Sequence, residues 1–242
     1  MDSFVEVEVL DSGTGIKDLQ SAFTLGSRKA AESPLNEHEF GFKHALASAN
    51  IDNNSWFIDT CTAEDRGKHQ FKRISAPYLI QGQKVEIINE SWNSEVSTTG
   101  TKIKFKCTRE LFKTISRGIR GQFSFSGIIS ILVEDLGFIY SGVLKDNGVH
   151  LIISEYDFNN TKIKSTTVKA IEPEWESYYP KLNSQEDIDL GNGKVHIKYC
   201  FGNIYELTQT KKYYKKNMAS SGAENRINGR ILAYNLFKEI WQ

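Results

Sequence analysis

Stretches with the pattern of β-strands recur along the chain. Residues 4–10 and 194–201 alternate apolar and polar side chains, which places the apolar ones on one face of an extended strand. Residues 101–107 alternate lysine with apolar residues, so the lysine face of this strand is expected to be exposed to solvent. Three more stretches are rich in β-branched and aromatic residues and also predict strands; they are residues 56–61, 84–89 and 149–156.

Helices are predicted at residues 17–26, 41–49 and 109–119. In the first of them Leu19 and Phe23 recur on one face. The second is rich in alanine, which allows a helix to pack closely on a sheet. Thr108 precedes the third and can cap its first turn with its side chain. Residues 27–38, which are polar and contain a proline, are expected to form a loop between the first two helices.

Composition bounds the kind of protein. With 242 residues the chain can form one large domain or two modest ones. Thirty basic and thirty acidic residues balance, so no net charge points to a nucleic-acid partner. The start of the chain does not resemble a signal peptide, and no apolar run approaches the roughly 20 residues of a membrane span. We therefore expect a soluble, cytoplasmic protein that does not bind a membrane.

Cysteine spacing excludes two further classes of protein. Cys61, Cys107 and Cys200 lie far apart and do not form a C-x-x-C pair. This spacing predicts neither a zinc site nor a disulfide framework. The three residues are expected to be small, buried, apolar side chains in a reducing compartment.

Three short motifs follow one another in the first half of the chain. Asp11-Ser12-Gly13-Thr14-Gly15 comes directly after the first strand, Gly41-Phe42-Lys43 opens a helix, and Gly100-Thr101 opens a strand. The first motif by itself is also typical of an ordinary turn that closes a strand. Its chemistry nevertheless suits a nucleotide. A carboxylate at a strand end can accept a hydrogen bond from the amine of adenine, whereas it would face the carbonyl of guanine.

The glycines and the lysine of these motifs suit the rest of a nucleotide. Gly13 and Gly15 allow positive φ and a close approach of the backbone to a ligand. Gly41 precedes a helix, whose first N–H groups and partial positive charge favour phosphate. Lys43 can add a point charge at the same place.

The order and spacing of these motifs resemble the nucleotide site of the GHKL superfamily, the gyrase, chaperone, histidine-kinase and MutL ATPases. The MutL- and MORC-like branch is the most similar. The resemblance implies an α/β fold of the α+β sandwich type. A Bergerat-type ATP-binding mixed sheet with helices on one face would span residues 1–112. A smaller, transducer-like α/β module would span residues 113–242, and its Asn228-Gly229-Arg230 turn has a counterpart in that family.

The resemblance also implies ligands and contacts. The ligands are ATP and Mg²⁺, and the loop at residues 27–38 would be the lid over the phosphates. That lid usually holds two or three glycines, of which this chain keeps Gly41 alone. Thr101 would support the base. The implied nucleotide-contacting residues are Asp11, Gly13, Gly15, Gly41, Phe42, Lys43, Gly100 and Thr101.

One family feature is missing from the sequence. In these ATPases a helix before the first strand carries the general base and an asparagine that ligates Mg²⁺. Here only four residues precede the strand that begins at Val5, so no catalytic residue is assigned and a truncated start at Met1 is expected. Two alternatives remain open. Either the helix comes from another chain or from residues 230–241, where Asn235 and Glu239 would lie on one face of a helix, or catalysis has been lost. Glu6 and Glu8 are expected on the solvent side of their strand.

Two functional hypotheses follow. The first is an ATP-binding conformational switch, with slow hydrolysis if the missing helix is supplied. By resemblance, such a switch gates homodimerisation in DNA-related or restriction-linked phage-defence processes. The second is a non-catalytic interaction or scaffold module with a relic nucleotide pocket. A histidine-kinase catalytic domain is disfavoured by the long second half of the chain.

One cluster is a candidate contact with DNA. Four lysines and two tyrosines lie between residues 211 and 216, and basic residues among aromatic ones can bind nucleic acid. A solvated face is the alternative interpretation of this run. The lysines are Lys211, Lys212, Lys215 and Lys216.

Overall fold

The protein is described here from a computed structural model. The described residues are 4–23, 41–77, 86–91, 98–116, 124–146, 148–177, 182–191, 193–204, 213 and 222–236. The chain divides into two compact units, Met1–Phe123 and Ser124–Gln242. The boundary that the sequence placed after residue 112 falls inside α4 (Arg109–Lys113), whose N-cap is Thr108, as predicted. Helix α4 follows β5 directly and belongs to the first unit.

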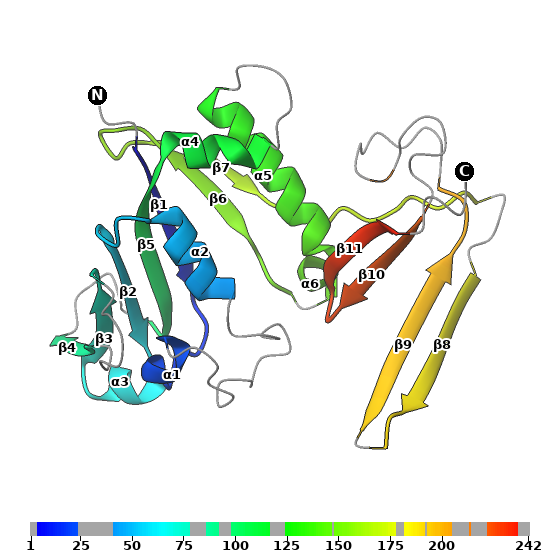
Figure 1. Ribbon diagram of the computed structural model, residues 1–242, viewed down its shortest axis with the longest axis horizontal. Coiled ribbons are helices and arrows are strands. Elements are labelled where there is room, and N and C mark those ends of the chain that lie inside the picture. The colour runs from blue at the N-terminus through cyan, green and yellow to red at the C-terminus, as the bar shows by residue number, and fades with distance from the viewer. Residues whose placement is uncertain are drawn as a thin grey trace. The chain divides into compact units, whose positions relative to one another are not determined.

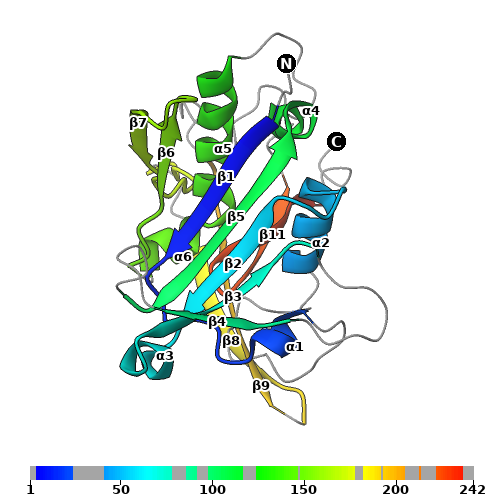
Figure 2. The ribbon, with the colours of Figure 1, turned by 90° about the vertical axis from the view of Figure 1, so that its left-hand side faces the viewer.

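A five-stranded sheet forms the first unit (Figure 2). In spatial order its strands are β1 (Phe4–Asp11), β5 (Gly100–Thr108), β2 (Trp56–Cys61), β3 (Gln70–Ser75) and β4 (Ile88–Ser91). Every pairing between these described strands is antiparallel, so the predicted mixed sheet is wrong for them. The reason is that alternation along one strand carries no information on the direction of its neighbour. Helices together with a mainly antiparallel sheet agree with the expected α+β class.

One face of this sheet is covered by α1 (Leu19–Phe23) and α2 (Gly41–Ala49). Leu19 and Phe23 of α1 are buried, and the Phe23 ring stacks on Trp56 with a centroid distance of 6.0 Å. Leu46 of α2 packs against the same cluster. Burying side chains of this size stabilises the fold by about 1.5–3 kcal/mol each. The strand residues of this core are Trp56, Ile58, Ile74, Ile103 and Phe105.

Charged residues occupy the opposite face of the sheet. Glu6 forms an ion pair with Lys104 at 2.8 Å, and Glu8 forms one with Lys102 at 3.3 Å. Both glutamates are exposed, as the alternation of β1 predicted. Exposed pairs of this kind contribute at most about 1 kcal/mol each. Further along, Arg73 holds Asp59 through two hydrogen bonds of 2.6 and 2.7 Å.

In the second unit the described residues form two helices and three hairpins (Figure 1). The helices are α5 (Phe125–Ile139) and α6 (Ser141–Asp146). The hairpins pair β6 (Ile152–Tyr156) with β7 (Lys162–Thr167), β8 (Leu182–Asp189) with β9 (Lys194–Phe201), and β10 (Ala223–Ile227) with β11 (Arg230–Leu236). Helix and hairpin backbones meet closely at Gly142, where an added Cβ would lie 2.6 Å from the Cα of Gly229.

The turn between β10 and β11 confirms one sequence prediction and overturns another. Asn228 and Gly229 both have positive φ, 50° and 82°, as a two-residue hairpin turn requires. The chain then continues as a strand to Leu236, so the helix predicted from residue 230 is wrong as far as that residue. Asn235 therefore lies on a strand, while Glu239 lies outside the described residues. The four-residue spacing of Asn235 and Glu239 favoured a helix, so the alternation of β11 was not recognised.

Arg226 links several elements of the second unit. It donates hydrogen bonds to Glu224 at 2.6 Å, to Glu172 at 2.7 Å and to the hydroxyl of Tyr213 at 2.8 Å. The Tyr213 ring also packs edge-on against Phe138 at 5.1 Å. Burial raises the pKa of this phenol above its usual range. Tyr213 is thus held in place by these contacts. It lies within the lysine cluster in the sequence, but the four lysines themselves lie outside the described residues.

The cysteines are all free, and Cys61 and Cys107 are buried as predicted. Cys200 is exposed, which corrects the prediction for that residue. It lies on β9, whose residues are all exposed. The alternation of β9 gave no sign that both of its faces would be open.

Candidate functional site

The turn after β1 is built by Asp11. Its carboxylate oxygen Oδ1 accepts a hydrogen bond from the backbone N–H of Gly13 at 2.8 Å, which closes the turn through the side chain. The residue is exposed, and a carboxylate has capacity for about four hydrogen bonds. The second oxygen, Oδ2, is therefore the atom that the turn leaves available to a ligand.

Gly15 brings the end of this turn against the middle of the sheet. Its φ is +74°, and a Cβ added there would lie 2.4 Å from the carbonyl oxygen of Cys61. No side chain fits at that distance. The sequence predicted positive φ and a close backbone approach to a ligand at Gly13 and Gly15. Positive φ is present at Gly15 but not at Gly13, because the Asp11 side chain already closes the turn there, and the close neighbour of Gly15 is protein backbone.

The third motif lies beside the first. Strands β1 and β5 pair so that Asp11 stands opposite Thr101. Gly100 has φ of +142°, and a Cβ added there would lie 2.1 Å from the carbonyl oxygen of Asp11. Two motifs that are far apart in the sequence thus meet at one end of the sheet because β5 returns antiparallel to β1.

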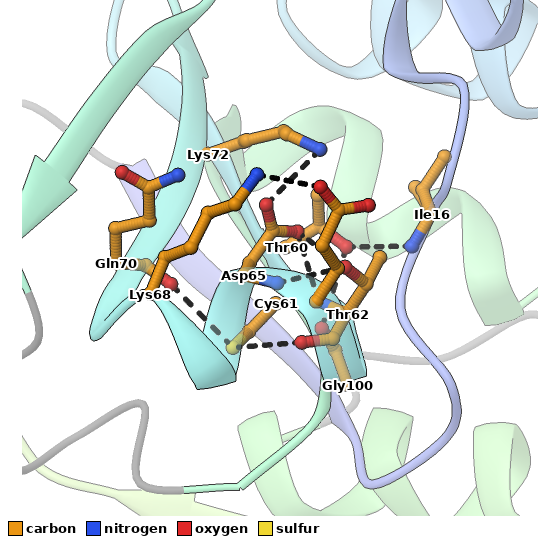
Figure 3. A network of polar contacts seen from close by, with 10 residues as sticks. Ile16, Thr60, Cys61, Thr62, Asp65, Lys68, Gln70, Lys72 and Gly100 are labelled. Carbon is orange, nitrogen blue, oxygen red and sulfur yellow. Dashed lines mark hydrogen bonds and ion pairs between the residues drawn. The ribbon is translucent and has the colours of Figure 1, made fainter.

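Thr60 of β2 joins the turn to the strand. Its hydroxyl oxygen accepts a hydrogen bond from the N–H of Ile16 at 2.7 Å (Figure 3). It also lies 3.2 Å from the hydroxyl of Thr101. The side chain is fully buried. Sequence reasoning did not single out Thr60, because a threonine in a strand is common and its partners come from two other segments. Its place opposite Thr101 becomes visible only when β2 and β5 are paired.

A polar network holds the backbone beneath Gly15 in place (Figure 3). Thr62 caps α3 (Ala63–Gly67), and Asp65 accepts hydrogen bonds from the Thr62 backbone at 3.1 Å and from its hydroxyl at 2.6 Å. Lys72 lies 3.1 Å from the other oxygen of Asp65, which is only 2% exposed. This capping box fixes Thr62, whose N–H nitrogen would lie 3.0 Å from a Cβ on Gly15.

We expect Thr60→Val to destabilise the first unit by about 1–3 kcal/mol, because an isosteric valine leaves the N–H of Ile16 without its acceptor. Thr60→Ser keeps the hydroxyl and should cost less. Urea unfolding with tryptophan fluorescence measures the difference, since Trp56 lies in the core of this unit. Equal midpoints for the valine and serine variants would contradict this role of the hydroxyl.

The Asp65 network should make the first unit sensitive to acid. Burial raises the pKa of Asp65, but the hydrogen bonds from Thr62 and the charge of Lys72 outweigh burial and hold it below its ordinary value of 3.8. A lowered folded-state pKa stabilises the fold above the unfolded-state value. That stabilisation should be lost as the pH falls from about 4 through the folded-state pKa. Unfolding curves of wild type and Asp65→Asn against pH test this, because the variant should lack that part of the acid dependence.

The phosphate-binding residues of the prediction lie on α2. Gly41 is its first residue, Lys43 is half-buried, and the side chain of Phe42 lies outside the described part of the chain. At the other end of the helix, the Asn50 amide donates to the carbonyl of Lys106 at 2.9 Å. Lys106 is near the end of β5, so the helix N-terminus points toward the end of the sheet that holds Gly100 (Figure 2). The first turn of α2 carries no acidic residue that would offset its partial positive charge.

A second copy of the same motif shows what the tertiary structure adds. Asp189-Leu190-Gly191-Asn192-Gly193 connects β8 to β9, and the Gly191 N–H donates to Asp189 at 2.8 Å, as in the first turn. A Cβ added at Gly191 or Gly193 would meet no atom within 4 Å. This turn is an ordinary hairpin connection. Only the turn at Asp11 lies against a second strand and a buried hydroxyl.

The described residues contain no group of three or more His, Cys, Asp or Glu side chains that could hold a metal ion. No helix within the described ranges is long and apolar enough to cross a membrane. No protein-family model matches the chain, and no curated protein matches it.

Proposed function

We propose that the first unit binds ATP at the end of the sheet formed by Asp11, Gly15, Gly100 and Thr101, and that it works as a nucleotide-dependent switch. One observation carries the proposal. Asp11 stands opposite Thr101 in the sheet, and Gly100 touches the backbone of Asp11, so separate motifs of a nucleotide site share one place. A Bergerat-type sheet, with α1 and α2 on one face, is part of the same proposal.

In this proposal Asp11 selects the base. Its Oδ1 is engaged by the N–H of Gly13, and Oδ2 accepts the exocyclic amine of adenine. Guanine would place a carbonyl oxygen against the same carboxylate, and two acceptors cannot pair. Thr101, whose hydroxyl is held by Thr60, supports Asp11 from the neighbouring strand. The phosphates lie at the N-terminus of α2, near Lys43.

Hydrolysis is a slower, secondary part of the proposal. The carboxylates around the turn already have partners: Asp65 with Lys72 and Thr62, and Glu8 with Lys102. A general base typically contributes about 10²–10⁴-fold to such a rate. We therefore propose that fast turnover needs a base from outside the described residues. Without it, ATP binding alone biases the conformation of the unit.

The test is calorimetric titration of the chain with a non-hydrolysable ATP analogue in Mg²⁺ buffer, with the matching GTP analogue as the comparison. Saturable binding of the ATP analogue and at least ten-fold weaker binding of the GTP analogue is the expected result. Equal binding of both would exclude Asp11 as the residue that reads the base. Absence of binding of either would overturn the proposal and favour the interaction module with a relic pocket.

A DNA-related role is the less supported part of the switch proposal. It rests on the four lysines that flank Tyr213 in the sequence. The Tyr213 hydroxyl itself accepts a hydrogen bond from Arg226. We expect weak, salt-sensitive binding of duplex DNA that the four lysine-to-alanine changes abolish, because phosphate contacts release counterions. Fluorescence anisotropy across a salt series measures this. Binding that does not change with salt, or that survives the four substitutions, would contradict it.

A further inference from the structure

The β8–β9 hairpin of the second unit is open to solvent on both faces. All sixteen residues of the two strands are exposed, and the pair forms a sheet of its own (Figure 1). A two-stranded hairpin alone in water is marginally stable at best, and a covered apolar face is what normally stabilises one. We therefore expect one face of the hairpin to be covered by another surface.

The two faces of the hairpin differ sharply in character. The register pairs Leu182 with Phe201 and Ile188 with Val195, so these side chains share a face. Along β9 every residue of this face is apolar. We call it the apolar hairpin face, and its apolar members are Leu182, Ile188, Val195, Ile197, Tyr199 and Phe201. The other face carries polar residues, among them Asp187, which pairs with His196.

We infer that the apolar hairpin face is a homodimer interface, in which the β9 rows of two copies pack face to face across a two-fold axis. The inference is independent of nucleotide binding. It places the four apolar side chains of β9 at the centre of the contact. Ser184 and Glu186, the two polar residues of this face, lie on β8 and so fall at the rim, where water reaches them. An apolar centre with a polar rim is the usual anatomy of such an interface.

The exposed area fits a second copy. The six apolar side chains are between 37% and 62% exposed. With ordinary side-chain areas this amounts to roughly 600 Å² per copy, or about 1,200 Å² for a symmetric pair, which is the lower end of the range for specific interfaces. The same patch on both copies contacts itself in a two-fold dimer.

Charge also favours a second copy over a charged partner. The two strands of the hairpin carry three acidic residues, Glu186, Asp187 and Asp189, and two lysines, Lys194 and Lys198, so the charges nearly balance. Neither nucleic acid nor an acidic peptide would be attracted to it. The whole chain has a formal net charge of +0, so long-range repulsion does not keep two copies apart.

Analytical ultracentrifugation of the full chain, from low-micromolar to several-hundred-micromolar concentration, tests the inference. Wild type should shift with concentration toward twice its 27.5 kDa. The double variant Ile197→Gln/Tyr199→Gln should stay monomeric, whereas Lys194→Gln/Lys198→Gln, with the same introduced residue on the opposite face of the same strand, should dimerise like wild type. A dimer that survives the first double variant would overturn the inference.

Cysteine cross-linking keeps the inference testable if the first double variant misfolds. In a Cys200→Ser background, Ile197→Cys should form an intermolecular disulfide on mild oxidation, while Lys198→Cys should not. A monomeric wild type would overturn the inference, and the reactivity of the Ile197→Cys thiol would then show why. An Ile197→Cys thiol that is freely reactive would show an uncovered face, and a protected one would show that another part of the same chain covers it.

Discussion

Replacing Asp11 with asparagine should lower the affinity for ATP by about 10- to 100-fold. The two side chains have the same shape, but asparagine has a single acceptor oxygen. In the structure one oxygen of residue 11 accepts the N–H of Gly13 at 2.8 Å. The atom left to face the adenine amine would then be an NH₂ group, and two donors cannot pair. Leaving such a group unsatisfied costs about 1–3 kcal/mol, which corresponds to this loss of affinity.

The matched control for Asp11→Asn is Asp189→Asn. It makes the same change in the same local turn, since Asp189 accepts the N–H of Gly191 at 2.8 Å. That turn lies between β8 and β9, so nucleotide affinity should not change. Titration with the ATP and GTP analogues measures both variants. If Asp11→Asn binds ATP as wild type does, Asp11 does not read the base, even if the pocket itself exists.

Gly100→Ala should be among the most destabilising single changes in the first unit, at about 3 kcal/mol or more. The φ of +142° is a conformation that other residues rarely adopt, and holding one there costs about 1–3 kcal/mol. The new Cβ would also meet the carbonyl oxygen of Asp11 at 2.1 Å, a rigid backbone atom that cannot move aside without separating β1 from β5. Overpacking of this kind adds about 1–3 kcal/mol.

Gly67→Ala is the control for Gly100→Ala. Gly67 ends α3, and a Cβ there would meet no atom within 4 Å. A glycine-to-alanine change in a helix should be neutral or slightly stabilising, by up to about 1 kcal/mol. Urea unfolding followed by tryptophan fluorescence, to which Trp56 in the core of this unit contributes, compares the two. Equal midpoints for the two variants would mean that β5 does not approach Asp11 as described.

Predictions from the sequence were most accurate where the structure depends on residues that are adjacent in the sequence. The β-branched and aromatic content of residues 56–61 predicted β2 with its bounds, and the alternation of residues 194–201 predicted β9 with its bounds. Thr108 caps α4 and Asn228-Gly229 forms a hairpin turn, because capping and turn geometry need only local hydrogen bonds and allowed φ values. Strand β3 was missed because Gln70–Ser75 mixes charged and apolar residues, and its burial comes from β2 and β4 on either side.

For this protein the sequence by itself determined local features such as strands β2 and β9, the Thr108 cap and the turn at Asp11, and an Asp-x-Gly-x-Gly turn closes in the same way at Asp189. Only the tertiary structure distinguished the two turns. It placed Gly100 and the buried Thr60 against the first and left the second open. It also decided that both faces of the β8–β9 hairpin are exposed. The physical reason is that strand pairing joins segments tens of residues apart through backbone hydrogen bonds that every residue can make, so local sequence does not encode which segments meet.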